Sequence, residues 1–408
     1  MSTGLHLTAD ERAMLAGEAG PGVQKAIEII VALGQIYGAG DLVPVASVQV
    51  SGVSFKNLGE AGLAFLEDWA ALGARARVPA TLNPAGMDLR DWRDLGFAQD
   101  FARSQRAVIE AYVALGIMPT CTCTPYLVGH VPELGQHIAW AESSAVSHAN
   151  SILGARTNRE GGPSALAAAI TGRTARYGLH LDQNRQPTTA VDVRCPIASE
   201  ADLGALGYWV GSQVKNGVPW FRFSQPPAAG WQWNTLGAAM AASGAVALYH
   251  VEGITAEAMS GDVRSPDVPT LVVDDLSPAY KALNGPTRAV DLVSLGCPHA
   301  SLAELEMVAG YLAGKSVKAA LWITTARATR EAAESAGLVA AIEAAGGHVV
   351  ADTCMVVAPV SGLGFRTMAT NSAKMAFYSP SHSGLSIRFG PMEQCLEAAV
   401  AGTWQHDP

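Results

Sequence analysis

The clearest pattern of apolar and polar positions lies in the last third of the chain. Residues 289–296 (AVDLVSLG) form a short apolar run typical of a buried strand, and residues 301–314 (SLAELEMVAGYLAG) follow with helical spacing. The order then repeats as strand, helix and strand at residues 317–325, 326–347 and 348–357. Such alternation predicts right-handed crossovers between the parallel strands of one sheet.

The earlier part of the chain is patterned less regularly. Thr8 and Glu11 have the spacing of a capping box, and apolar residues at helical spacing follow them to about residue 34. Residues 43–52 (VPVASVQVSG) read as a strand, and two further helices are expected at residues 59–74 and 101–115. Together these elements predict an α/β fold.

Three domains are expected from these patterns. Residues 1–150 would form an N-terminal α/β domain with a CTCTPY loop, and residues 151–288 a central domain rich in glycine and proline. Residues 289–408 would form a C-terminal βαβ domain that carries the GCPH and DTC loops.

Cysteines stand next to the expected strand ends. Cys297 follows the first strand of the C-terminal pattern, Cys354 lies near the end of the third, and Cys123 lies in a loop flanked by prolines. Ligands of open α/β sheets bind at the carboxyl ends of the strands, so we expect Cys297 and Cys354 to face one crevice. Three thiols from separate segments suit a bound metal or an iron–sulfur cluster with one open position.

The residues alone leave other interpretations of these cysteines open. Buried packing is the commonest role of a cysteine. Zinc is a second alternative, with His299 as a possible fourth ligand, although the chain contains no CxxC pair. Cys195 and Cys395 are expected to be structural.

Composition and charge narrow the class of protein. Charged residues make up 15% of the 408 positions, whereas a typical soluble domain has roughly 25%. The formal net charge is −9 and no basic cluster stands out, which argues against a nucleic-acid partner. The N-terminus lacks the order of a signal peptide, and the uncharged stretch at residues 223–251 contains Pro, Gln, Asn and Gly, so it is a poor membrane span. The sequence therefore predicts a cytoplasmic protein without a membrane partner.

Several long motifs resemble one known family. TCTCTPYL, WAESSAVSHANSILGARTNREGGPSALAAAITGRTARYGLHLDQNR, SLGCPHASLAELE, DTCMVVAP and TNSAKMAFYSP occur in this order. They resemble aconitase X, a divergent branch of the aconitase superfamily, from about Leu7 to Trp404. The resemblance implies three α/β/α domains with mainly parallel sheets around an iron–sulfur site, and Cys123, Cys297 and Cys354 as the cluster ligands. Cys121 would be a neighbour of that cluster, whose nuclearity stays open and which air can remove.

Polar residues in the same motifs are candidates for binding the substrate. Small hydroxyl groups suit a carboxylate or hydroxyl, guanidinium groups can clamp an anion, and a lysine can anchor one. The candidates are Ser143, Ser144, Arg156, Asn158, Arg159, Asn371 and Lys374. Their ordinary alternatives are a helix cap, a solvated loop with an internal ion pair, and a surface lysine.

The resemblance also implies the reaction, a hydro-lyase that removes water from a small hydroxy acid. The main expectation is conversion of cis-3-hydroxy-L-proline to 1-pyrroline-2-carboxylate, because no basic cluster beyond Arg156, Arg159 and Lys374 is available for a phosphate. Mevalonate 5-phosphate is the alternative substrate, which fits members with separate subunits. A non-catalytic, metal-stabilised binding protein is the alternative of another class.

The catalytic base is not identified in this chain. In the family a serine in a small swivelling domain does this work, beside a Gly-Arg-Gly followed by serines. No Gly-Arg-Gly occurs in these 408 residues. We therefore expect a small partner subunit that carries the base, in a heterodimer.

Overall fold

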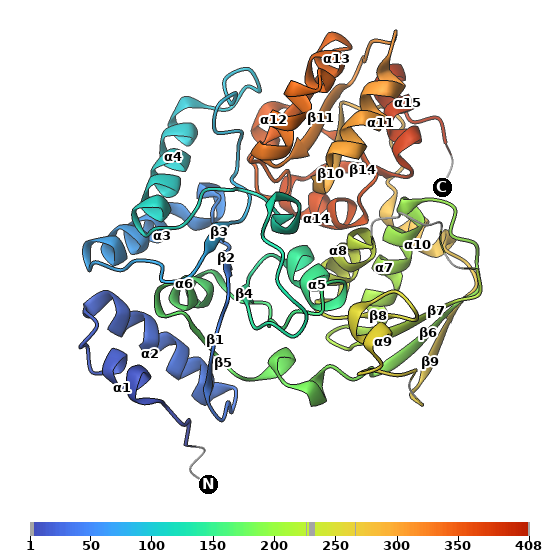
Figure 1. Ribbon diagram of the computed structural model, residues 1–408. Helices are drawn as coiled ribbons and strands as arrows, with labels where there is room; N and C mark the ends of the chain where they lie inside the picture. Colours follow the sequence, from blue (N-terminus) through green and yellow to red (C-terminus); the bar gives the residue numbers. More distant parts are fainter. Residues whose placement is uncertain (1–3, 226, 228–232, 266, 407–408) are drawn as a thin grey trace.

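Three lobes make up the computed structural model, which describes residues 4–225, 227, 233–265 and 267–406. Figure 1 shows the first lobe in blue, cyan and green, the second in lighter green and yellow and the third in orange and red. No described helix is long and apolar enough to cross a membrane. Of the uncharged stretch at 223–251, residues 226 and 228–232 lie outside the described residues, as do residues 1–3 and 407–408 of the expected terminal domains.

The first lobe is built around a parallel sheet in the order β3-β2-β4, with β1 and β5 pairing antiparallel beside it. Helices α2, α3, α4 and α6 pack around one apolar core with these strands. The elements are α1 (Ala9–Leu15), α2 (Pro21–Ile36), β1 (Leu42–Pro44), β2 (Val48–Val50), α3 (Phe55–Ala71), β3 (Ala80–Leu82), α4 (Gln99–Ala114), η1 (Pro125–Val128), β4 (Ala139–Trp140), α5 (Ser143–Ser151), α6 (Gly162–Thr171), β5 (Arg173–Ala175), η2 (Gly178–His180) and η3 (Asp182–Asn184).

The second lobe contains a four-stranded parallel sheet in the order β8-β7-β6-β9. Its helices α7 and α8 lie against each other, between this sheet and α14 of the third lobe. The elements are β6 (Thr189–Val193), α7 (Glu200–Val214), β7 (Pro219–Phe223), α8 (Asn234–Gly244), β8 (His250–Val251), α9 (Ala256–Ser260), β9 (Thr270–Val273) and α10 (Ser277–Leu283).

The third lobe confirms the parallel sheet expected from the alternating pattern. Its five strands have the order β12-β11-β10-β13-β14, and all the pairs are parallel. The elements are β10 (Leu292–Ala300), α11 (Leu302–Leu312), β11 (Ala320–Thr325), α12 (Arg327–Ser335), α13 (Leu338–Ala344), β12 (Gly347–Ala351), η4 (Val360–Leu363), β13 (Thr367–Thr370), α14 (Ala373–Ser383), β14 (Ser386–Phe389) and α15 (Met392–Ala401).

Three expected elements are divided in the structure. The capping box of Thr8 and Glu11 is present, but the helix ends at Leu15. The next helix, α2, begins only after Gly20, whose φ of 97° is a value that glycine adopts readily and other residues rarely do. The helix expected at 326–347 is interrupted at Gly337, with φ 74°. The strand expected at 43–52 becomes β1 and β2, because each half pairs with a different strand.

The packing of α6 bears on the first domain boundary. Six consecutive buried residues of this helix, 165–170, belong to the apolar core of the first lobe, and β5 pairs with β1. We therefore propose that the first domain extends to about residue 183, instead of ending at residue 150.

Candidate active site

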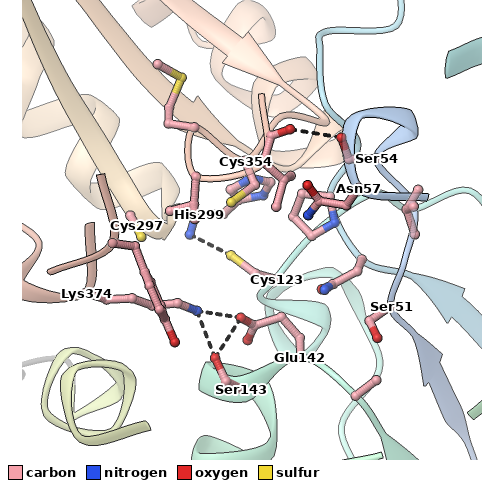
Figure 2. Close-up of a pocket in the computed structure, with 18 of the residues that line it drawn as sticks. Ser51, Ser54, Asn57, Cys123, Glu142, Ser143, Cys297, His299, Cys354 and Lys374 are labelled. Atoms are coloured by element: carbon pink, nitrogen blue, oxygen red, sulfur yellow. Dashed lines mark hydrogen bonds and ion pairs between the residues drawn. The ribbon is translucent and has the colours of Figure 1, made fainter. Parts of the chain in front are cut away.

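A pocket of about 370 Å³ lies between the first and third lobes. Segments that follow β2, β3, β4 and β12 line it, together with the end of β11 and a part of β10. The pocket thus lies at the carboxyl ends of parallel strands from two sheets, where open α/β folds bind ligands. Cys123, Cys297 and Cys354 all line it (Figure 2), and Cys297 and Cys354 thus face one crevice, as their places at the strand ends predicted.

Each cysteine reaches the pocket from a different kind of segment. Cys123 precedes the 3₁₀ turn η1. Cys354 lies in the turn after β12, and its own backbone N–H donates to the carbonyl oxygen of Ala85 at 3.1 Å. Cys297 lies within β10, where the pairing with β11 shifts register. The preceding Gly296 makes this approach possible, because a Cβ there would lie 2.1 Å from the carbonyl oxygen of Thr324.

The three thiols are free and close enough to influence one another. Burial raises the pKa of each above its ordinary value, that of Cys297 to about 11. The charge of Cys297 further raises the pKa of Cys123, and that of Cys354 raises the pKa of Cys297. The Lys374 ammonium opposes these effects by lowering the pKa of all three thiols, and a bound metal would favour their thiolate forms further.

Three thiols from separate segments are the donor set by which proteins hold iron–sulfur clusters. In the described part of the chain, no group of three or more His, Cys, Asp or Glu side chains is arranged to hold one metal ion. A cluster contains several irons and sulfides between its thiolate ligands, so its ligands lie farther apart. His299 does not fit the zinc alternative, because its ring nitrogens lie 3.0 Å from Thr122 Oγ1 and 2.8 Å from the carbonyl oxygen of Thr353.

A buried ion pair forms one wall of the pocket. Lys374, on the first turn of α14, places Nζ 2.5 Å from Oε1 of Glu142 and 3.1 Å from Oγ of Ser143 (Figure 2). Glu142 is also the N-cap of α5, where Oε2 accepts hydrogen bonds from the Ala145 N–H and the Ser144 hydroxyl. The helix-cap alternative for this motif is thus correct, and it coexists with a place at the pocket.

Both members of this pair are charged. Burial alone would raise the pKa of Glu142, but the Lys374 ammonium and the hydrogen bonds from Lys374, Ser144 and Ala145 hold it below the ordinary value. Burial would lower the pKa of Lys374, but Glu142 and the neighbouring thiols Cys297 and Cys123 hold it well above the ordinary value. The pocket therefore contains a fixed ammonium beside the thiols.

The polar residues expected at the substrate site divide into two groups. Ser143, Arg159 and Lys374 line the pocket. The other four, Ser144, Arg156, Asn158 and Asn371, are absent from its lining.

The four outside the lining have other partners or places. Ser144 is fully buried and donates to Glu142. Arg156 forms an ion pair with Asp182, and the Asn158 amide binds the backbone of Tyr177 and Leu179. Asn371 lines two other cavities, of about 20 and 660 Å³.

Sequence reasoning missed a polar segment on the opposite wall of the pocket. Residues 51–54 (SGVS), Asn57 and Asn83 line it at the ends of β2 and β3 and at the start of α3. The signal was available, because Ser51 and Gly52 end the strand-like run at residues 43–52, and ligands of open α/β folds bind at strand ends. These residues carry no reactive group, however, and their place became evident only once the two lobes faced each other.

Three domain models of aconitase X match the chain, the first at residues 4–183, the second at 187–280 and the third at 290–401. The chain belongs to the aconitase X family. It is therefore a hydro-lyase, because its relatives are dehydratases, and this does not support the non-catalytic alternative.

Individual members of the aconitase X family resemble the whole chain. The phosphomevalonate dehydratase large subunit of Methanothermobacter thermautotrophicus is 52% identical over 93% of this chain and 95% of its own. The cis-3-hydroxy-L-proline dehydratase of Pseudomonas aeruginosa is 37% identical over 98% of this chain and 70% of its own. A crystal structure of Thermococcus kodakaraensis aconitase X in its holo-form has a TM-score of 0.90 at 46% identity, covering 97% of this chain and all of that one.

Proposed function

We propose that this chain is the large subunit of an iron–sulfur dehydratase that removes water from 5-phosphomevalonate, in a heterodimer with a small subunit. The observation that carries the proposal is the identity of 52% with a phosphomevalonate dehydratase large subunit over almost the full length of both chains. The main expectation from the sequence, cis-3-hydroxy-L-proline, has weaker support, since the matching dehydratase is 37% identical.

The wall missed by sequence reasoning supports a phosphorylated substrate. Ser54 caps only the first turn of α3, residues 55–58, because Gly59 has non-helical backbone angles, and the Ser54 hydroxyl donates to the carbonyl oxygen of Val357 at 2.9 Å. Ser51, Gly52 and Val53 precede it along the same wall of the pocket. The Ser51 hydroxyl and the side-chain amides of Asn57 and Asn83, which line the same wall, can donate hydrogen bonds to phosphate oxygens. The sequence analysis favoured hydroxyproline because the chain has no further basic cluster to bind a phosphate. Hydrogen bonds from this wall would bind the phosphate without such a cluster.

The wall that carries the three cysteines and Lys374 is suited to bind the reacting end of the substrate. Cys123, Cys297 and Cys354 would hold the cluster, and when bound it supplies a Lewis-acidic iron for the leaving hydroxyl. Lys374 provides a fixed positive charge for the substrate carboxylate, with its position set by Glu142 and Ser143. Arg159 lines the same pocket and offers a second cation.

The base that removes the proton is proposed to come from the small subunit. The buried acidic and imidazole groups of the pocket already have hydrogen-bond partners. Glu142 binds Lys374, Glu160 accepts from Ser164 and Thr174, and His299 binds Thr122 and Thr353. The M. thermautotrophicus relative is named as a large subunit, which supports a smaller partner.

The proposal is tested by loading the chain with iron and sulfide under anaerobic conditions, together with the small subunit encoded in the same genome. Water loss from 5-phosphomevalonate should require both chains. Cys297→Ser should abolish activity, whereas Cys395→Ser, a matched change at a buried cysteine outside the pocket, should retain it. Activity of Cys297→Ser equal to that of the unchanged enzyme would contradict the proposed site.

A further inference from the structure

His299 contacts all three segments that carry the pocket cysteines. It lies two residues after Cys297, and its backbone N–H donates to Sγ of Cys123 at 3.1 Å. Its Nδ1 lies 3.0 Å from Oγ1 of Thr122, next to Cys123. Its Nε2 lies 2.8 Å from the carbonyl oxygen of Thr353, next to Cys354. One side chain thus connects segments 177 and 54 residues away in the sequence.

The partners determine how the protons are arranged. A backbone carbonyl only accepts, so Nε2 of His299 carries the proton that binds Thr353. In a neutral ring Nδ1 is then an acceptor, and the Thr122 hydroxyl donates to it. Thr122 Oγ1 in turn accepts from the N–H of Thr124 at 3.1 Å. Every member of this chain therefore has a consistent donor and acceptor role.

The completeness of these bonds distinguishes His299 from other buried histidines. It is 2% exposed, and both ring nitrogens have partners. His148, His180 and His250 each have one buried ring nitrogen without a hydrogen-bond partner among the described residues. A histidine that only fills space in the core need not reach three separate segments, whereas one that fixes their spacing must.

We propose that His299 is a positioning residue, which holds the three cysteine segments at the spacing that the cluster needs. The proposal rests on the proposed function, since it concerns the same site. Hydrogen bonds around ligands orient them and typically change metal affinity about 10- to 100-fold when removed. The carbonyl of Thr353 and the hydroxyl of Thr122 transmit the position of the imidazole to Cys354 and Cys123, while the backbone bond acts on Cys123 directly.

The first test uses the full chain without iron. The rates at which iodoacetamide alkylates Cys123 and Cys354 are measured by mass spectrometry, peptide by peptide. His299→Ala should raise both rates about fivefold or more, because each lost hydrogen bond frees its segment. His348→Ala, the same change at an exposed histidine on β12, should leave them unchanged. Equal rates in His299→Ala and the unchanged chain would overturn the proposal.

The second test uses the chain loaded with iron and sulfide. His299→Ala should lose the visible absorbance of the cluster about tenfold faster or more. His299→Gln keeps a donor for Thr353, and Thr122→Val removes only a hydroxyl, so both should be intermediate even where His299→Ala folds poorly. If both hold the cluster as long as the unchanged chain, the proposal fails. An unchanged chain that takes up no iron would contradict the proposed function instead, and the alkylation rates would still decide the role of His299.

Discussion

Lys374 and Glu142 form an ion pair between two lobes, with Nζ of the lysine 2.5 Å from Oε1 of the glutamate. Lys374 lies on the first turn of α14 in the third lobe, and Glu142 caps α5 in the first. Their side chains are 10% and 8% exposed, so each charge is stabilised by the other rather than by water. The same pair that places a cation in the pocket therefore also joins the lobes that enclose it.

Replacing the lysine should cost stability as well as activity. Lys374→Met leaves the Glu142 carboxylate buried without its cation, which typically costs about 3–5 kcal/mol. Urea unfolding at neutral pH should show this loss in the free energy of unfolding. The double variant Lys374→Met/Glu142→Gln should recover much of the stability, because no unpaired charge remains, but no activity. An unchanged midpoint in Lys374→Met would show that the pair is not buried in solution.

A second ion-pair network should fix the Cys354 turn. Arg327, at the start of α12, lies 2.5 Å from carboxylate oxygens of both Asp88 and Asp352. Arg327→Met leaves the buried Asp352 carboxylate without its cation, whereas Asp88 keeps Arg330, and the free energy of unfolding should fall by about 3–5 kcal/mol. Arg90→Met is the control, because the pair of Arg90 with Glu331 is exposed and such pairs contribute about 0–1 kcal/mol. Equal effects of the two substitutions in urea unfolding would contradict this network.

Acid should destabilise the protein through His180. Burial, with the positive charges of His137, Arg185 and Arg156, lowers the pKa of this imidazole to about 3. In the unfolded chain His180 binds a proton near pH 6.5. Its contribution to the free energy of unfolding is therefore fully present above that pH and is lost as the pH decreases towards 3. One such group contributes a slope of about 1.4 kcal/mol per pH unit in this window.

The contribution of His180 can be isolated from those of other buried histidines. The free energy of unfolding is measured between pH 7.5 and 5 for the unchanged chain and for His180→Gln. The variant should show a slope smaller by about one proton, whatever its stability at pH 7.5. Parallel slopes would mean that His180 is protonated alike in the folded and unfolded states.

The proposed binding of the phosphate at residues 51–54 predicts that a charge placed there weakens the binding of 5-phosphomevalonate. Ser51→Asp places a carboxylate where the phosphate is proposed to bind, and the repulsion of like charges should raise KM for 5-phosphomevalonate about tenfold or more. Ser51→Asn, of the same size but neutral, should have a much smaller effect. Steady-state kinetics of the two variants decide the matter, since equal KM values would place the phosphate elsewhere.

The third lobe was predictable from sequence because its signals are local. β10, β11 and β12 are apolar and long enough to stand out, and Ser301 with Glu304 forms the capping box that begins α11. The first lobe was less so, because β1 pairs with β5 more than 120 residues away and its strands have only two or three residues. Short strands are determined by their partners rather than by their own pattern.

The candidate site was predictable to the extent that its residues carry distinctive chemistry. Cysteine and lysine drew attention to Cys123, Cys297, Cys354 and Lys374, which all line the pocket. Arg156 drew attention for the same reason but is paired with Asp182. The segment at residues 51–54 consists of common residues, and only the approach of two distant strand ends gives it a place in the pocket.

The ratio of kcat/KM values for 5-phosphomevalonate and cis-3-hydroxy-L-proline tests the central claim most directly. It is measured for the chain loaded with its cluster and combined with the small subunit, by following water loss from each compound. The proposed phosphate contacts predict a ratio of about 100 or more. Turnover of the hydroxyproline alone, by an enzyme whose iron content shows a full cluster, would contradict the account.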